Sequence, residues 1–286
     1  MKGQIIKKVA NNFLVKIGDK NISCIPRGNL KSSGIFVGDY VEIENDIIEN
    51  IHPRKNQFIR PPLANLDALV IVIANVPKPD FMIVDKMILF SLCYGVEPIL
   101  VINKIDSGKE LYDYVKKVYR DVVKNIFATN AILGEGIEQL KKALNNKLCA
   151  FSGQSAVGKS ALVNSILKEH ASTVGEISIK NQKGKNTTRH CEIFFEKNIS
   201  ITDTAGFTSL DEKLLPIAYY ELPYYYPDFV KIMKDCKYKS CVHINEKDSE
   251  CAIKQALNNN LIDKDRYLRY KQIYNILLQK WVRTHG

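Results

Sequence analysis

The sequence contains no apolar run of the roughly 18–20 residues that a membrane-spanning helix requires. The segment that begins at Met1 also lacks the apolar core of a signal peptide. We therefore expect a cytoplasmic protein without a membrane partner, whose seven cysteines are reduced thiols or metal ligands rather than a disulfide framework. The composition does not indicate disorder, because 45% of the residues are hydrophobic and 25% are charged, which is ordinary for folded soluble proteins.

Length and charge distribution indicate more than one domain. A chain of 286 residues exceeds the roughly 100–200 residues of a single domain. Residues 1–61 carry 10 basic and 6 acidic side chains, residues 62–226 carry 19 and 18, and residues 227–286 carry 12 and 7, so the net charge of +10 divides into +4, +1 and +5. Such a distribution is compatible with ordinary surface lysines, or with a near-neutral central module between two modules that face a polyanion.

Short β-type runs separated by turn residues fill residues 3–51. The five runs are Gln4–Val9, Phe13–Ile17, Ile22–Ile25, Tyr40–Ile43 and Ile47–Ile51. They predict a small closed barrel of the OB type, which often binds oligonucleotides, although an SH3-like barrel has the same periodicity. Pro53 and the pair Pro61-Pro62 then predict a linker.

Apolar strands alternate with helices in the next part of the chain. The predicted strands are Leu66–Ala74, Ile99–Ile102 and Asn125–Thr129, and the predicted helices are Ile83–Cys93, Leu111–Val118 and Ile137–Leu144. Regular alternation with near-continuous apolar strands predicts a parallel, doubly wound sheet.

The stretch Gly153–Ser160 fits the phosphate-binding pattern G-x-x-x-x-G-K-[ST]. An apolar run at Lys147–Ser152 precedes it and a helical pattern at Ser160–Ile166 follows, which is the context that the motif requires. Its glycines let backbone N–H groups face a polyphosphate, and the helix N-terminus adds a positive dipole. We expect Lys159 to reach the β- and γ-phosphates and Ser160 to ligate Mg²⁺. The predicted nucleotide contacts here are Gly153, Gln154, Ser155, Ala156, Val157, Gly158, Lys159, Ser160 and Ala161.

A guanine-reading motif, Asn103-Lys104-Ile105-Asp106, follows the second strand of the alternating region. Asp106 can accept hydrogen bonds from the N1–H and N2 amino groups of guanine, and Asn103 can bond its N7/O6 edge. Adenine lacks that donor pair, so the motif beside a phosphate loop favours GTP binding over an ATP-using kinase. We expect nucleotide contacts from Asn103, Lys104 and Asp106, while Thr129-Asn130-Ala131 occupies the place of the loop that backs the base.

The segment after the phosphate loop is expected to hold the magnesium ion and the γ-phosphate. Thr188, in the polar run 180–189, can complete the Mg²⁺ shell and make the run a switch, although an ordinary solvated loop has the same composition. Predicted strands at Cys191–Phe195 and Ile199–Thr202 lead into Asp203-Thr204-Ala205-Gly206. We expect Asp203 to be a magnesium partner and the Gly206 N–H to sense the γ-phosphate.

The glutamine that orients the attacking water in Ras-like enzymes has no counterpart here, since Phe207 stands in its place. An aromatic ring cannot orient water, so we expect slow intrinsic hydrolysis and activation by a partner. His190 is the candidate water-positioning group. The alternative, given equal weight, is that His190 is a surface histidine at a strand edge without a catalytic role. The predicted catalytic residues are Lys159, Thr188, Gly206 and His190.

The order of these motifs is inverted relative to ordinary Ras-like enzymes, because the guanine-reading motif precedes the phosphate loop by about fifty residues. The same sheet forms if the original termini are joined and the chain is cut after the Asp203–Gly206 segment, since domain termini often lie close together at the surface. We therefore expect a circularly permuted GTPase domain whose second switch leads directly into the C-terminal part.

The C-terminal part contains a cluster of soft metal ligands. Cys236, Cys241, His243 and Cys251 fall within sixteen residues and provide the ligand set of a closed tetrahedral zinc site, which can stabilise a module with a small core. The other cysteines (Cys24, Cys93, Cys149 and Cys191) are interpreted as packing residues. The last helical stretch repeats apolar side chains at three- and four-residue spacing, which is interpreted as core packing rather than a base-stacking platform: Tyr267, Tyr270, Tyr274, Leu277 and Trp281.

With these motifs taken together, the chain resembles the bacterial ribosome small-subunit-dependent GTPase A family. The resemblance spans nearly the whole chain: Arg60–Asp67, Asn103–Asp106, Gly153–Ser160, Lys185–His190, Asp203–Phe207 and the Cys/Cys/His/Cys cluster. The sequence departs from the family pattern at Ala156, where the family has Gly, at Ala205, where it has Pro, and at Asn186, where it has His. The spacer between His243 and Cys251 is also longer than usual.

The resemblance implies a multidomain protein with an OB-fold barrel, a circularly permuted α/β GTPase domain and an α-helical zinc-binding domain, at residues 1–62, 63–223 and 224–286. It implies GTP hydrolysis stimulated by the small ribosomal subunit during late maturation of that subunit, with rRNA contacts, Mg²⁺ with GTP, one structural Zn²⁺ and a monomeric state. The alternative is an RNA-binding assembly scaffold that binds GTP with little turnover.

Overall fold

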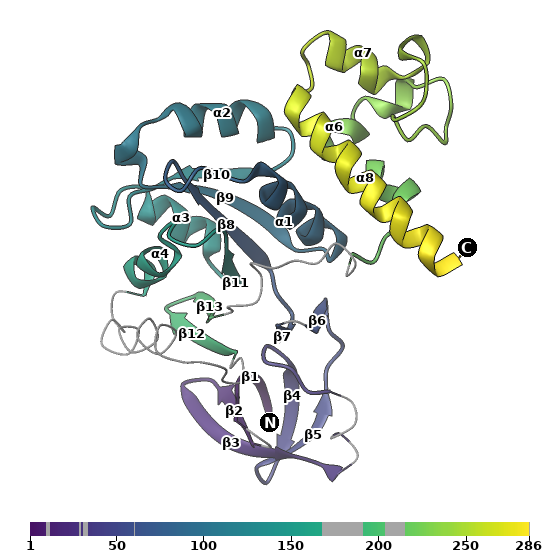
Figure 1. Ribbon diagram of the computed structural model, residues 1–286. Coiled ribbons are helices and arrows are strands. Elements are labelled where there is room, and N and C mark those ends of the chain that lie inside the picture. Colours follow the sequence, from purple (N-terminus) through teal and green to yellow (C-terminus); the bar gives the residue numbers. More distant parts are fainter. Residues whose placement is uncertain are drawn as a thin grey trace.

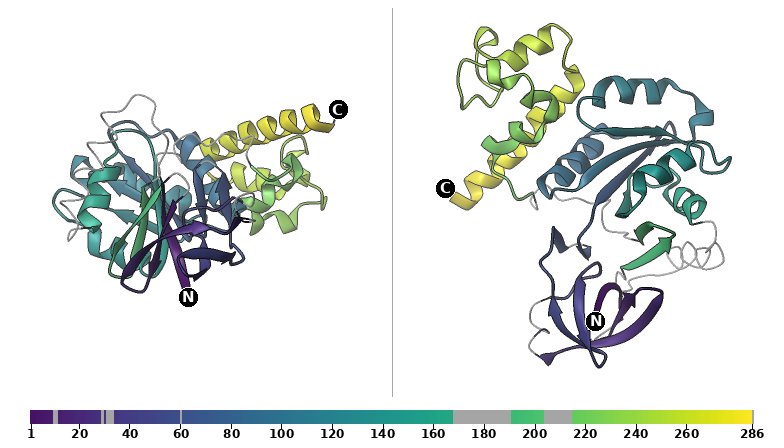
Figure 2. Two further views of the ribbon diagram at one scale, coloured as in Figure 1. Left: turned by 90° about the horizontal axis from the view of Figure 1, so that it is seen from below. Right: turned by 180° about the vertical axis from the view of Figure 1, so that it is seen from behind.

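The protein forms three consecutive modules in a computed structural model, which describes residues 1–9, 12–28, 30, 34–59, 61–167, 191–203 and 215–285. Figure 1 shows a β-barrel at one end, a central sheet flanked by helices, and a group of C-terminal helices beside the upper part of that sheet. The two further views in Figure 2 agree that the barrel and the C-terminal helices contact different sides of the central module. The central module therefore connects the other two.

Five strands build the N-terminal barrel: β1 (Lys2–Val9), β2 (Asn12–Ile17), β3 (Lys20–Pro26), β4 (Tyr40–Glu44) and β5 (Ile47–Ile51). Their order is β1-β2-β3-β5-β4, and a further β1–β4 pairing closes the barrel. Alternate side chains such as Ile5, Val15 and Ile48 are fully buried inside it, as the period of two along a strand requires. The predicted barrel is confirmed as an OB-like barrel.

The stretch predicted as a linker contains a short ribbon of two antiparallel strands, β6 (Gln57–Ile59) and β7 (Pro62–Ala64). The prolines at this point did not exclude pairing, because only three residues of each strand take part. Phe58 is buried and its ring lies 5.4 Å from Phe90 and 5.0 Å from Tyr94. The ribbon crosses the predicted boundary at residues 62 and 63, which stays a prediction.

The central sheet has the order β10-β9-β8-β11-β13-β12. Its strands are β8 (Ala68–Ala74), β9 (Glu97–Asn103), β10 (Asn125–Ala128), β11 (Lys147–Ser152), β12 (Glu192–Glu196) and β13 (Ile199–Asp203). All neighbours are parallel except β12 and β13. A β1–β12 pairing at Lys7 and Glu192 joins the sheet to the barrel, which gives eleven strands in one continuous sheet.

Helices cover both faces of the central sheet. The longer ones are α1 (Phe81–Cys93), α2 (Glu110–Tyr119), α3 (Ile137–Leu144) and α4 (Lys159–Ile166), with the short 3₁₀ turn η2 at Ile105–Ser107. Every residue of β8 is buried, and its side chains alternate between the core under α1 and α2 and the core under α3 and α4. The predicted doubly wound sheet is confirmed.

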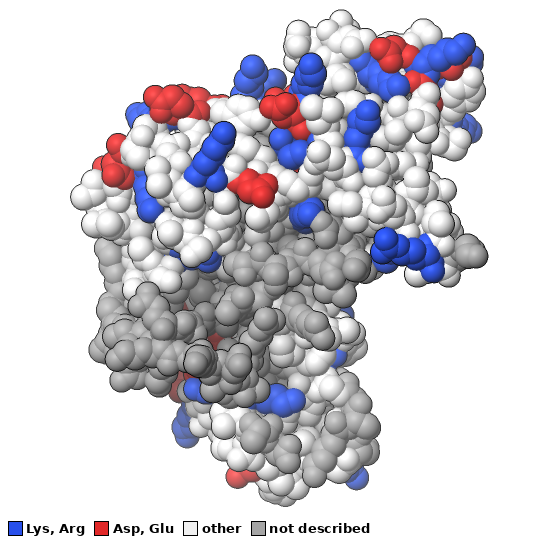
Figure 3. Space-filling view, in the orientation of Figure 1, with Lys and Arg blue, Asp and Glu red and all other residues white. Residues whose placement is uncertain are grey.

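The C-terminal module is helical: η5 (Tyr219–Tyr225), α6 (Pro227–Val230), η6 (Met233–Asp235), η7 (Asp248–Glu250), α7 (Ala252–Asn258) and α8 (Lys264–His285). The stripe on α8 is buried at Tyr267, Tyr270, Tyr274 and Leu277, so the prediction of core packing is confirmed there, whereas Trp281 is only half-buried. No helix in the described part of the chain is long and apolar enough to span a membrane. Figure 3 shows basic side chains over this module and the central one, with acidic side chains between them.

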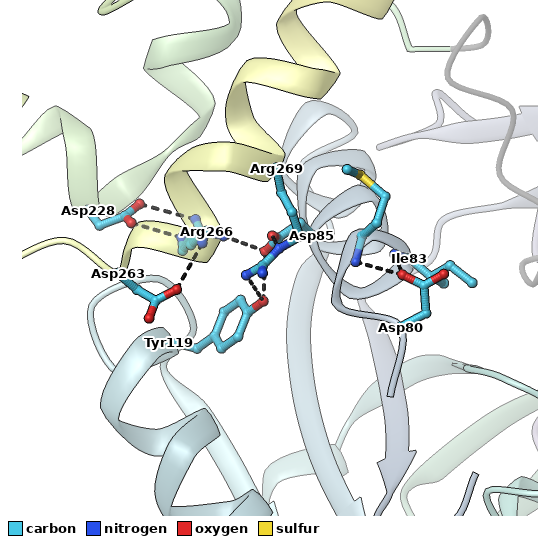
Figure 4. Close-up of polar contacts among 9 residues, drawn as sticks. Asp80, Ile83, Asp85, Tyr119, Asp228, Asp263, Arg266 and Arg269 are labelled. Carbon is cyan, nitrogen blue, oxygen red and sulfur yellow. Dashed lines mark hydrogen bonds and ion pairs between the residues drawn. The ribbon is translucent and has the colours of Figure 1, made fainter. Parts of the chain in front are cut away.

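A buried group of charges fastens α8 to the central module, as Figure 4 shows. The Asp85 carboxylate of α1 pairs with Arg266 and Arg269 of α8 and accepts a hydrogen bond of 2.9 Å from the Tyr119 hydroxyl. Arg266 also pairs with Asp228 of α6 at 2.9 and 3.1 Å. Burial, reinforced by the nearby Asp85 charge, raises the pKa of Tyr119. We call these five residues the interdomain charge cluster.

Candidate functional site

The phosphate-loop segment, residues 153–158, connects β11 to α4 at the carboxyl end of the central sheet. Gly153 has φ +142°, and a Cβ there would lie 2.1 Å from the Val72 carbonyl oxygen. Gly158 has φ +93°, and its Cβ would lie 2.3 Å from Asn103 Nδ2. Only glycine fits such positions, since any side chain would collide with the next strand. The two motif glycines therefore let the loop pack directly against the ends of β8 and β9.

Ala156 is the remaining unusual position of the loop, with φ +64°. A left-handed backbone brings Cβ close to the following carbonyl oxygen, which costs a non-glycine residue about 1–2 kcal/mol. The sequence resemblance described above implied a glycine at this position. The loop thus keeps its left-handed turn with an alanine in place.

Lys159, the first residue of α4, folds back over the loop. Its Nζ donates hydrogen bonds to the carbonyl oxygens of Gly153 at 2.9 Å and Gln154 at 2.6 Å. Partial burial lowers the pKa of this ammonium group, because desolvation disfavours the charged form. Ser155 and Ser160 are exposed at the same end of the helix. A cation, two hydroxyls and the N-terminus of α4 thus converge where a phosphate chain is expected to bind.

Asn103 joins the phosphate loop to the guanine-reading loop. Its Nδ2 donates to the Val157 carbonyl at 3.0 Å, and its Oδ1 accepts from Thr129 Oγ1 and from the Ala131 N–H, both at 3.2 Å. The side chain is 2% exposed, so its amide forms hydrogen bonds with other groups of the protein. Asn103 is placed as a positioning residue, and its predicted bond to the purine edge stays a prediction.

Lys104 and Asp106 lie at the surface of the same region. The Lys104 side chain crosses the phosphate loop and donates to the Ala156 carbonyl at 2.8 Å and to the Val76 carbonyl at 3.2 Å. Asp106 is exposed, and one of its carboxylate oxygens accepts a 2.7 Å bond from Asn130 Nδ2. The phosphate-loop and guanine-reading residues that the sequence predicted are therefore close together in the folded chain.

Asn130 was not among the predicted site residues, yet it shapes the guanine-reading region. It is 5% exposed, and its Oδ1 accepts from the Ile132 and Leu133 N–H groups at 3.0 and 3.1 Å while its Nδ2 holds Asp106. An asparagine that caps its own loop is a known turn signature. The signal in the sequence was the position of Asn130 directly after a strand, in the segment assigned only loosely to the base.

Gln154 connects the phosphate loop to the first turn of α1. Its Oε1 accepts from the Asp80 N–H at 2.9 Å, and its Nε2 donates to the Lys78 carbonyl at 3.3 Å. The Asp80 carboxylate in turn caps α1 by accepting from the N–H groups of Met82 and Ile83. A hollow of about 420 Å³ adjoins this contact, lined by Pro77, Ile83, Gly153, Gln154 and Ser155.

The remaining predicted GTPase residues are placed only in part. Asp203 ends β13, one residue beyond Thr202, which is paired with Ala150 of β11. Its backbone therefore lies at the carboxyl end of the parallel strands, where the phosphate loop also lies. Thr188, His190 and Gly206, together with Thr187 and Phe207, lie outside the described residues.

The predicted metal ligands converge in the C-terminal module. The ligand atoms of Cys236, Cys241, His243 and Cys251 all lie within 4.8 Å of one another. His243 Nδ1 is 3.7, 3.1 and 3.5 Å from the three sulfur atoms in chain order. Tetrahedral zinc, with bonds of about 2.0–2.3 Å, separates its ligand atoms by roughly 3.5–3.8 Å. The three nitrogen–sulfur distances lie near that range, so the three thiols and one imidazole are a candidate zinc site.

Burial keeps the histidine of this cluster in the form that a metal needs. It lowers the pKa of His243 to about 4, so the ring is neutral near pH 7 and Nδ1 can be an electron-pair donor. The His243 carbonyl accepts from the Tyr267 hydroxyl, and the Val242 carbonyl from the Tyr270 hydroxyl, both at 2.7 Å. The buried tyrosines of α8 thus hold the metal-ligand loop as well as filling the core.

The other four cysteines are free thiols. Cys24, Cys149 and Cys191 are buried, and Cys93 is half-buried. Burial raises the pKa of Cys93 to about 12. Their interpretation as packing residues is consistent with these positions.

The profile of the family described as RsgA GTPase matches residues 51–213. A relative from Caldanaerobacter subterraneus subsp. tengcongensis, named small ribosomal subunit biogenesis GTPase RsgA, is 35% identical over 296 aligned residues, covering 100% of this chain and 98% of the relative. The crystal structure of YjeQ from Thermotoga maritima superposes with a TM-score of 0.81 at 29% identity, over 97% of this chain and 98% of that one.

The crystal structure of YloQ, described as a circularly permuted GTPase, superposes with a TM-score of 0.78 at 26% identity, covering 98% of this chain and 95% of that one. The order of elements in this chain has the same character, because β9 and the guanine-reading loop precede β11 and the phosphate loop. Similarity over almost the full length of each protein includes the barrel and the C-terminal helices as well as the central module.

Proposed function

Because this chain belongs to the RsgA GTPase family and is a GTP-hydrolysing enzyme, we propose that it binds the small ribosomal subunit and hydrolyses GTP, with stimulation by the subunit, during late maturation of that subunit. The name of the relative from Caldanaerobacter supports the place in ribosome biogenesis. The observation that carries the nucleotide assignment is the Asn103 side chain, which ties the phosphate loop to the guanine-reading loop. One ligand with both a polyphosphate and a guanine satisfies both loops.

We assign the nucleotide contacts of this site as follows. Lys159 and the Gly206 N–H bind the γ-phosphate, and Asp106 reads the guanine while Asn130 orients its carboxylate. Further contacts come from Asn103, Lys104, Gly153, Gln154, Ser155, Ala156, Val157, Gly158, Ser160 and Ala161.

Ser160, Thr188 and Asp203 are assigned to hold Mg²⁺. A bound magnesium ion neutralises charge on the β- and γ-phosphate oxygens. Ser160 lies in the first turn of α4 beside the loop and Asp203 ends the strand β13, which supports this assignment. His190 is assigned to position the attacking water, because Phe207 cannot; unchanged subunit-stimulated turnover in His190→Ala would remove that role.

A structural zinc ion is proposed at Cys236, Cys241, His243 and Cys251, and the domains are proposed to span residues 1–62, 63–223 and 224–286.

We further propose that a conformational change caused by loss of the γ-phosphate is transmitted to the C-terminal module through residues 207–215. Lys280 of α8 donates a 2.8 Å bond to the Leu215 carbonyl at the end of that segment, which supports the route. Equal affinity for small subunits with GDP and with a non-hydrolysable GTP analogue would contradict it.

The test of the proposed function is phosphate release from GTP under multiple turnover, with and without purified small subunits and their rRNA. We expect slow release alone and faster release with subunits, with ATP not hydrolysed. Lys159→Ala is the inactive control, because it removes the phosphate-binding cation. Equal rates with and without subunits would contradict the proposed stimulation.

The protein is proposed to be cytoplasmic and monomeric, and sedimentation measures the oligomeric state.

A further inference from the structure

The C-terminal module contains a second hollow, of about 650 Å³, that the nucleotide site does not use. Pockets for small-molecule groups span roughly 300–1,000 Å³. This one opens between η5, α6 and the metal-ligand loop, and none of its lining residues is acidic. Its lining includes three of the proposed metal ligands, Cys236, Cys241 and His243, and the exposed residues Tyr220, Tyr224, Val230, Lys234, Tyr238 and Lys239.

Three exposed tyrosines stand around this hollow, although aromatic side chains are usually buried. Tyr220, Tyr224 and Tyr238 are 48%, 61% and 45% exposed. The Tyr220 ring is held edge-on by Tyr219 and Trp281, with centroids 5.3 and 5.6 Å away. Rings that are already held in place lose little conformational entropy when a flat group stacks on them.

The third ring is held by polar neighbours. The Tyr238 hydroxyl donates to Glu250 at 3.4 Å, and the Lys237 ammonium lies 5.2 Å from the centre of the Tyr238 ring. The walls of the hollow are therefore partly preformed.

The lysines at the hollow differ from their neighbours in having no acidic partner. Lys234 and Lys239 are exposed and form no ion pair within the described part of the chain, whereas Lys231 pairs with Asp121 and Lys237 pairs with Glu250. Unpaired ammonium groups beside a wall of aromatic rings are complementary to a chain of phosphates with attached bases. Charge and surface chemistry thus point to the same kind of ligand.

We propose that this hollow binds an unstacked base of a single-stranded RNA segment, with the base stacked on Tyr224 and Tyr220 and the flanking phosphates on Lys234 and Lys239. Sequence-tolerant recognition of single-stranded RNA uses stacking on aromatic rings together with cationic side chains. The inference deepens the proposed function, on which it rests, because unpaired rRNA segments on the small subunit supply this ligand. The hollow adjoins η5, a few residues beyond the proposed 207–215 route.

The test uses the full chain and a ten-nucleotide oligouridylate that carries one central 5-iodouridine, which forms photo-crosslinks to stacked aromatic side chains. We expect crosslinks at Tyr220, Tyr224 or Tyr238, located by mass spectrometry of the peptides. The same oligonucleotide with an abasic central position keeps the phosphates and should bind about tenfold more weakly, as loss of one stacked base predicts. Crosslinks confined to other parts of the chain would overturn the proposal.

Matched variants separate stacking from charge. Tyr224→Ala should lose the crosslink and the preference for the base, whereas Tyr224→Phe keeps the ring and should retain both. Lys239→Gln should weaken binding of the intact and the abasic oligonucleotide equally, and Lys264→Gln, an exposed lysine of the same module, should change neither. If Tyr224→Ala binds fewer small subunits but retains oligonucleotide affinity, the hollow binds a protein and the RNA proposal is wrong.

Stimulated GTP turnover of the wild-type chain is measured in parallel. Absence of stimulation contradicts the proposed function, whereas stimulation combined with unchanged oligonucleotide binding in Tyr224→Ala contradicts the hollow alone. The two failures are therefore distinguishable.

Discussion

The nucleotide region and the C-terminal module are held together by different parts of the polypeptide. The phosphate loop depends on backbone geometry, because Gly153 packs against Val72 of β8 and Gly158 packs against Asn103 of β9. Residues 215–285 contain no strand. The metal-ligand loop of this module is held instead by side chains, namely the four metal ligands and two tyrosine hydroxyls of α8. Loss of a metal-ligand side chain should therefore leave the nucleotide region folded but should unfold part of the C-terminal module.

Cys251→Ala should have the largest effect. A structural zinc ion contributes on the order of 10 kcal/mol to the folding of small zinc modules, and Cys251 is fully buried directly before α7. We expect rapid tryptic cleavage at Lys237 and Lys239, and the same result after treatment with a chelator. Guanine nucleotide binding should remain within about twofold of the wild type, because the core under α3 and α4, which includes Val157 of the phosphate loop, is separate from the core that the C-terminal module shares.

Cys93→Ala is the matched control for that variant, since Cys93 lies outside the cluster. It should keep the proteolytic pattern of the wild type. Loss of nucleotide binding in Cys251→Ala would break the comparison, because it would make the two regions one folding unit.

Asp85→Asn tests the interdomain charge cluster. This change removes the negative charge that Arg266 and Arg269 share, and the Arg266 side chain is only 3% exposed. Removing one partner of a buried ion pair lowers the free energy of unfolding by about 3–5 kcal/mol. Lys231→Gln is the control, because the Lys231–Asp121 pair joins the same two modules with exposed side chains and such pairs contribute about 0–1 kcal/mol. Urea unfolding should separate the two, and equal costs would show that the cluster does not hold the modules together.

Asn130→Ala should weaken guanine nucleotide binding without altering the fold. Loss of a hydrogen bond to a charged group costs about 1.5–3 kcal/mol, so we expect about a tenfold or greater loss of GDP affinity in calorimetry. Asn125→Ala removes one bond from Asn125 to Glu97 at the opposite end of the sheet and should leave the affinity unchanged. An unchanged affinity in Asn130→Ala would mean that Asp106 is positioned without it.

Ala156→Gly should have the smallest effect, and it should be stabilising. Glycine removes the left-handed strain of Ala156, for a gain of at most about 1 kcal/mol. Ala161→Gly, in the first turn of α4, should instead destabilise by about 0.5–1 kcal/mol. Thermal unfolding measures both, and a destabilised Ala156→Gly would show that the loop tolerates alanine without strain.

Local patterns in the sequence predicted most of the fold. The barrel strands follow from period-two hydrophobicity, and the helices with the tyrosine stripe of α8 follow from a period of 3.6, because burial on one face imposes those periods. The central strands follow from near-continuous apolar runs, because both of their faces are buried. The ribbon at Gln57–Ala64 was missed, since three-residue strands between prolines carry no periodic signal. The phosphate loop and the metal ligands were found because their chemistry requires fixed residue types at fixed spacings.

The sequence by itself determined which residues form the phosphate loop, the guanine-reading motif and the metal cluster, because each lies within one short segment. Only the tertiary structure decided how these segments are joined. Asp85 meets Arg266 across 181 residues, and Asn103 meets the phosphate loop across 54. No local rule encodes such contacts, since their partners are selected by the packing of the sheet and helices between them. The hollow beside the metal-ligand loop arises in the same way, from side chains that only the fold brings together.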